Sequence, residues 1–215
     1  MADISAKKAF TIFSALIVWL ALLIQFKVSL KLANGDYVAT IKLLLSFFTI
    51  LTNLLVAICF TVVSFLPKRR IGIFFSKTST TTALTVYILV VAIIYNLLLR
   101  GLLSPVGWAR VSDELLHVVS PLIFLVFWLF FVEKSGISYS SAIKWLIYPM
   151  LYIFFILIRG YFVHNYPYPF IDVVTLGYTK ALINASMIVI FFWLLSLLLI
   201  FIGKKFPGAK ERTLR

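Results

Sequence analysis

Long apolar runs, separated by short polar segments, make up most of the chain. Crossing a bilayer core of about 30 Å takes about 20 residues of helix, and most of these runs have a similar length without a charged residue. Runs such as LLSLLLIFI show no alternation of apolar and polar positions, so a membrane β-barrel is not indicated. Because lipid cannot hydrogen-bond free backbone groups, the spans are predicted to be helices. Six are expected: 10–26, 43–66, 83–99, 115–132, 145–158 and 181–203.

The composition supports this interpretation. Of the 215 residues, 63% are hydrophobic and 13% are charged, whereas a soluble domain is about half apolar and about a quarter charged. Water-soluble and disordered classes are therefore excluded. A single cysteine, Cys59, excludes a disulfide framework. The segments between spans are too short for a soluble domain, so residues 1–215 are expected to form one domain, an all-α six-helix transmembrane bundle.

The positions of the basic residues predict the orientation of the chain. It carries 20 Lys and Arg against 7 Asp and Glu, a net charge of +13. The N-terminus, the second and fourth loops and the C-terminal tail hold 13 of the basic residues, and the alternate loops hold 7. Because cytoplasmic loops are enriched in Lys and Arg, both termini are predicted to be cytoplasmic. Topology thus explains much of the basic excess, and nucleic acid is not an expected partner.

Polar residues concentrate toward the non-cytoplasmic ends of the spans, where ionisable groups usually face the bundle or a cavity. Counted from predicted starts near Leu43 and Val111, Thr49 and His117 each lie six residues into a span, which predicts a shared depth. A hydroxyl beside an imidazole is the smallest pair that forms an activated nucleophile. Asp113 precedes His117 by four residues, so its carboxylate can orient the ring on a helix.

A packing role for the same residues stays open. Thr49, Thr52 and Asn53 share one helix face, and threonine in a membrane helix often bonds the carbonyl one turn earlier. Asparagine often joins two membrane helices. Pro121 follows His117 by four residues and removes the N–H that would bond the His117 carbonyl.

Three segments, FFTILTNLLVA, SDELLHVVSP and IRGYFVHNYPYPFIDV, resemble a known family. They look like the bacterial "predicted six-transmembrane protein" family, which is distantly similar to the animal androgen-induced protein and androgen-dependent TFPI-regulating protein family. The animal family is known for six-span hydrolases that cleave fatty acid esters of hydroxy fatty acids with an intramembrane threonine and histidine. The resemblance implies a multi-pass protein of the bacterial plasma membrane, with His117 and Thr49 in these two positions. Thr52 is the reserve, because Asn53 follows Thr49 by four residues where the animal motif has three.

The expected activity is therefore hydrolysis of a lipid ester by a threonine nucleophile. His117 would take the Thr49 proton and later activate water, while Asp113 would stabilise the imidazolium. An oxyanion needs donors, for which Asn53, Arg100 and Tyr95 are candidates by their side of the membrane.

The expected partners are membrane lipids and a lipid-like substrate. Arg100 or Arg159 could anchor a fatty-acid carboxylate near the outer interface. No metal site and no cofactor is expected, because the chain has no HExxH motif, P-loop or GxGxxG.

Two other classes remain as alternatives. Intramembrane ionisable residues could form the path of a transporter or channel, although the chain has no inverted repeat and no Gly/Pro-broken pair of spans. A non-catalytic membrane protein is the second alternative.

Overall fold

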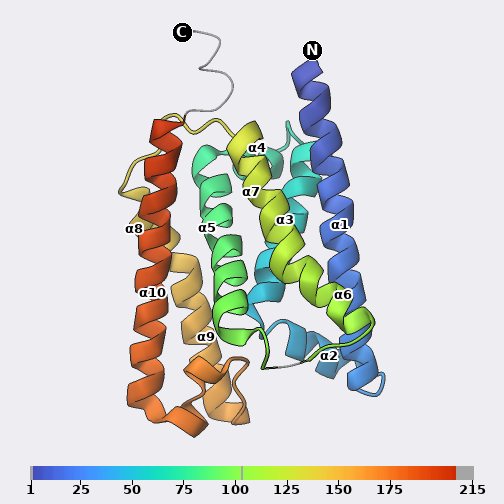
Figure 1. Ribbon diagram of the computed structural model, residues 1–215, viewed down its shortest axis with the longest axis vertical. Helices are drawn as coiled ribbons and strands as arrows, with labels where there is room; N and C mark the ends of the chain where they lie inside the picture. Colours follow the sequence, from blue (N-terminus) through green and yellow to red (C-terminus); the bar gives the residue numbers. More distant parts are fainter. Residues whose placement is uncertain (1, 103, 207–215) are drawn as a thin grey trace. The chain divides into compact units, whose positions relative to one another are not determined.

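The computed structural model of the chain describes residues 2–102 and 104–206, and over these residues the fold is all-α (Figure 1). Among these described residues, six helical segments are long and apolar enough to cross a membrane, which confirms the predicted fold class of a multi-pass helical membrane protein. These segments are Ser5–Leu32, Phe48–Phe65, Thr78–Leu99, Trp108–Phe131, Ser141–Val163 and Val173–Lys205.

Three of these spans, Thr78–Leu99, Trp108–Phe131 and Ser141–Val163, consist of more than one helical element. The elements up to the middle of the chain are α1 (Ala2–Leu32), α2 (Tyr37–Leu44), α3 (Phe48–Phe65), α4 (Arg70–Ser76), α5 (Thr78–Ile94), the π-helical turn η1 (Tyr95–Leu99) and α6 (Trp108–Glu114). The remaining elements are the π-helical turn η2 (Leu115–Val119), α7 (Ser120–Phe131), α8 (Ser141–Trp145), α9 (Ile147–Val163), the 3-10 turn η3 (Pro169–Ile171) and α10 (Val173–Lys205).

The described residues form two compact units. One comprises those of Met1–Ser135 and Gly203–Arg215, and the other comprises Gly136–Ile202. In the first unit, α1 packs against α3 and α7, and α5 packs against the same two helices (Figure 1). Its core is aromatic: the buried Phe60 ring lies 5.2 Å from that of Phe124 and 5.3 Å from that of Phe127, measured between centroids.

The helix within the second predicted span, 43–66, begins later than the predicted start, because a break separates α2 from α3, which begins at Phe48. The backbone N–H of Ser46 donates to the Leu43 carbonyl at 3.0 Å, and the Ser46 hydroxyl donates to the same oxygen. This local bonding competes with continuation of α2. Thr49 therefore lies in the first turn of α3.

The fourth span also begins elsewhere, at Trp108 rather than Leu115, because α6 continues through Asp113 and Glu114. A charge interrupts an apolar run without interrupting the backbone hydrogen bonds of a helix. The helix that carries Thr49 begins later than predicted, and the helical segment that carries His117 begins earlier. Thr49 therefore lies fewer than six residues from the start of its helix, and His117 lies more than six residues from the start of its segment.

Gly177 interrupts α10 with a φ of 73° and a ψ of 161°, a conformation that is essentially restricted to glycine. Replacing Gly177 by alanine is expected to lower the free energy of unfolding by about 1–3 kcal/mol. Thermal unfolding in detergent measures this loss. Gly203→Ala is the control, since the new Cβ would lie an ordinary 3.4 Å from Lys134 in a regular part of α10. Equal losses in both variants would contradict the explanation.

Candidate functional site

The centre of the candidate site is His117, on η2, which is paired with the carboxylate of Asp113, on α6. Nδ1 of His117 lies 2.9 Å from the carbonyl oxygen of Asp113 and 3.1 Å from its Oδ1. Both neighbours are acceptors, so Nδ1 carries the proton of the neutral ring and Nε2 keeps a lone pair. Within the described part of the chain, Nε2 makes no hydrogen bond. The ring is therefore oriented as a base with its second nitrogen available.

Tyr95, in η1, holds both members of this pair. Its ring stacks on the His117 ring, with centroids 3.6 Å apart and planes inclined by 13°. Its hydroxyl donates to Oδ2 of Asp113, the carboxylate oxygen that does not face the imidazole. The side chains of His117 and Asp113 are only 13% and 17% exposed. One residue thus restrains the plane of the base and the orientation of its carboxylate.

Arg100 closes the more exposed edge of the cluster. Its Nη1 and Nη2 donate to the two carboxylate oxygens of Glu114 at 2.7 and 2.9 Å, and its Nε donates to Oδ1 of Asn96 at 2.7 Å. The hydrogen bonds to Glu114 raise the pKa of the Arg100 guanidinium above its usual value, so the group stays cationic. All three guanidinium nitrogens already have partners. A substrate carboxylate would have to compete with Glu114 for Arg100.

The two elements that carry Tyr95 and His117 are π-helical turns, whereas Asp113 and Glu114 lie on the α-helix α6. The N–H of Arg100 bonds the Tyr95 carbonyl at 2.7 Å, and the N–H of Ser120 bonds the Leu115 carbonyl, each five residues earlier. Single π turns of this kind occur frequently at functional sites.

At η2, Pro121 leaves a carbonyl without a backbone donor. The N–H of Ser120 is used on Leu115, and Pro121 has no N–H to offer to Leu116. The side chain of Asn53, on α3, replaces this donor: its Nδ2 lies 3.2 Å from the Leu116 carbonyl oxygen. A side chain of α3 thereby supplies the hydrogen bond that the backbone of η2 lacks.

The same amide connects the predicted nucleophile to the histidine segment. Nδ2 of Asn53 also donates to the Thr49 carbonyl at 2.9 Å, so the backbone of Thr49 lies close to Leu116, the residue before His117. Both N–H groups of the amide are used in this way, and Asn53 has none left for an oxyanion. Thr49 itself is half-buried, and the reserve Thr52 is fully buried.

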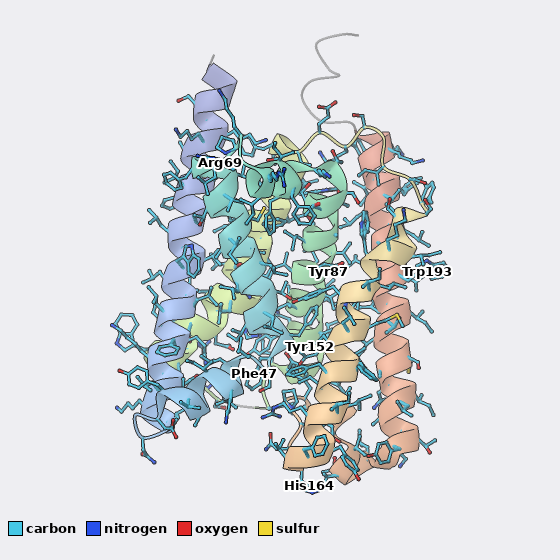
Figure 2. All side chains as sticks on the ribbon, turned by 180° about the vertical axis from the view of Figure 1, so that it is seen from behind. Phe47, Arg69, Tyr87, Tyr152, His164 and Trp193 are labelled. Atoms are coloured by element: carbon cyan, nitrogen blue, oxygen red, sulfur yellow. The ribbon has the colours of Figure 1, made fainter. Side chains whose placement is uncertain are left out.

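Arg159 lies in the second unit, near the end of α9. Its Nη1 donates to the Asn165 carbonyl at 3.0 Å. His164, labelled in Figure 2 at the end of α9, has a φ of 51° and terminates the helix in a left-handed conformation. These contacts organise the turn after α9, and the role of Arg159 in substrate binding stays a prediction.

Sequence reasoning missed two features of the site. It considered Tyr95 only as an oxyanion donor, whereas its single O–H donates to Asp113. It did not consider Asn96, which also donates to the His117 carbonyl at 3.4 Å. The spacing of four residues between Asn96 and Arg100 is a signal that could have identified this second residue.

No group of three or more His, Cys, Asp or Glu that could hold a metal ion occurs among residues 2–102 and 104–206. Comparisons of the chain with models of known protein families, with curated proteins and with solved structures find no match.

Proposed function

We propose that this protein is an intramembrane hydrolase of lipid esters, with Thr49 as the nucleophile and His117 as the base. Fatty acid esters of hydroxy fatty acids, or similar lipids, are the proposed substrates. The observation that carries the proposal is the pairing of His117 with Asp113. Tyr95 stacks on the imidazole and bonds the carboxylate, and Nε2 of His117 remains available to accept a proton. A carboxylate and an imidazole in this relation form the proton-transfer half of a catalytic triad.

The proposed reaction has two steps. Oγ1 of Thr49 attacks the ester carbonyl while Nε2 of His117 takes the hydroxyl proton, and this proton then leaves with the alcohol. Water attacks the acyl-threonine, giving one proton to Nε2; the fatty acid departs, and the proton returns to Thr49. Asp113 stays ionised and stabilises the imidazolium in both steps.

The developing oxyanion needs a source of positive charge other than the Asn53 and Tyr95 donors expected from the sequence. Asn53 and Tyr95 have committed their N–H and O–H groups to other acceptors. Thr49, however, lies in the first turn of α3, an 18-residue helix. The N-terminal end of a helix carries a partial positive charge that stabilises negative charge nearby. We propose that this end of α3 supports the oxyanion.

The test compares Thr49→Ala with Thr52→Ala in purified protein, using a branched fatty-acid ester as the substrate. Thr49→Ala is expected to lower kcat by roughly 10³-fold, because the attacking oxygen is removed. Thr52→Ala is expected to retain most of the turnover. A fluorophosphonate probe is expected to label the wild type and Thr52→Ala but not Thr49→Ala.

Unchanged turnover in Thr49→Ala would contradict the proposal. Loss of labelling only in Thr52→Ala would move the nucleophile to Thr52. A pH-driven flux in proteoliposomes that requires His117, without any ester turnover, would favour the transport alternative instead.

A further inference from the structure

Two buried polar atoms near η2 have no hydrogen-bond partner in the described part of the chain. They are Oδ1 of Asn53 and Oγ of Ser120, and both residues have 0% exposure. Both lie near the Leu116 carbonyl, because Asn53 donates to it at 3.2 Å and Ser120 follows Leu116 by one helical turn. Buried polar atoms are nearly always hydrogen-bonded, since an unmet one carries an uncompensated cost of desolvation.

Ser120 differs from other serines in the long helices of this protein. Four of them donate to the carbonyl four residues earlier, at 2.7, 2.7, 2.9 and 2.7 Å: Ser14, Ser64, Ser186 and Ser196. For Ser120 the corresponding acceptor is Leu116, whose carbonyl accepts from Asn53 instead. The π turn η2 also directs the backbone N–H of Ser120 to Leu115. The Ser120 hydroxyl is therefore left without the partner that its residue type normally uses.

We propose that Asn53 Oδ1 and Ser120 Oγ together bind one internal water molecule between α3 and the start of α7. The amide oxygen can only accept a hydrogen bond, whereas the serine hydroxyl can donate and accept. Their common ligand must therefore donate at least one hydrogen bond, and water can both donate to the amide and accept from the serine. Internal waters typically bridge buried polar groups that lack other partners. An anion is disfavoured because the amide oxygen would repel it.

This water completes the connection between two helices. Asn53 already bonds Thr49 on its own helix and Leu116 on η2, and the water extends this link to Ser120, next to Pro121. The site thereby fixes α3 against the segment that carries His117. Burial and hydrogen-bond valence alone call for this water, whether or not the protein hydrolyses lipid esters.

The first test measures thermal unfolding of the full-length protein in detergent. Ser120→Ala is expected to lower the midpoint by about 3–6 °C, because the water loses one partner and Asn53 Oδ1 is left poorly satisfied. Ser196→Ala is the matched control, since Ser196 is equally buried and its hydroxyl donates to the Phe192 carbonyl of its own helix. We expect a smaller shift in this control. A midpoint for Ser120→Ala equal to or above that of the wild type would overturn the proposal, because removal of a truly unpartnered hydroxyl relieves a burial cost.

The second test is an experimental structure of the wild type and of Ser120→Ala at a resolution that shows ordered water. An isolated density within hydrogen-bonding distance of both Asn53 Oδ1 and Ser120 Oγ is expected in the wild type, and its loss or displacement is expected in the variant. A direct Asn53–Ser120 hydrogen bond would overturn the proposal. A density continuous with an acyl chain would overturn it as well, since the ligand would then be the polar group of a lipid.

Discussion

Replacement of His117 by alanine is expected to lower kcat/KM for a branched fatty-acid ester by about 10³-fold or more. Nε2 of the imidazole is the proposed proton acceptor, and the Asp113 carboxylate beside the ring already accepts from Tyr95, so loss of the ring removes the base proposed for the hydroxyl of Thr49. Asp113→Asn is expected to lower kcat/KM as well, because an amide N–H facing Nδ1 would favour the tautomer with the proton on Nε2. Steady-state kinetics on purified protein measure both losses.

His164→Ala provides the matched control for this prediction. His164 ends α9 in the second unit, whereas the residues of the Asp113 cluster belong to the first unit. Its replacement is expected to leave kcat/KM within about threefold of the wild type, as is usual for a residue outside the reacting groups. Equal losses for His117→Ala and His164→Ala would indicate a general effect on folding. Full activity in His117→Ala would exclude it as the base.

Replacement of Asn53 by alanine is expected to lower the free energy of unfolding by about 2–4 kcal/mol, because it leaves buried polar atoms without donors. No backbone N–H replaces the Asn53 amide as a donor to the Leu116 carbonyl, since the N–H of Ser120 bonds the Leu115 carbonyl and Pro121 has no N–H. The link between α3 and η2 is lost at the same time. For a chain of this size, the thermal midpoint in detergent is expected to fall by about 5–12 °C.

Asn96→Ala is a control with nearly the same bonding in a different environment. Nδ2 of Asn96 donates to the Ala92 carbonyl at 2.8 Å and to the His117 carbonyl at 3.4 Å, which parallels the two bonds of Asn53. Asn96 is exposed, however, and its acceptors lie closer to the surface. A loss of less than about 1 kcal/mol is therefore expected. If both variants lost the same stability, burial of the Leu116 carbonyl would not be the cause.

The number and type of the membrane-spanning elements could be predicted from apolar runs alone, because lipid imposes helices and a minimum length. The exact start of α3 could not, since it depends on the Ser46 side chain bonding the Leu43 carbonyl. The start of α6 was also missed, because charge does not mark the end of a helix that continues beyond its apolar part. These errors changed the predicted distances of Thr49 and His117 from the starts of their helices, but they did not change the predicted fold class.

By itself, the sequence determined which residues share a helix and therefore that Asp113 and His117, four positions apart, could meet. Such pairs follow from the 3.6-residue period of a helix, whatever surrounds it. Only the tertiary structure decided that Tyr95 stacks on His117, that Asn53 bonds Leu116, and that Arg100 pairs with Glu114. These contacts join separate helices, so they depend on the rotation and register of each helix against its neighbours. The packing of the helices sets this rotation and register. Neither can be read from a run of apolar residues, because such residues can face lipid or protein equally well.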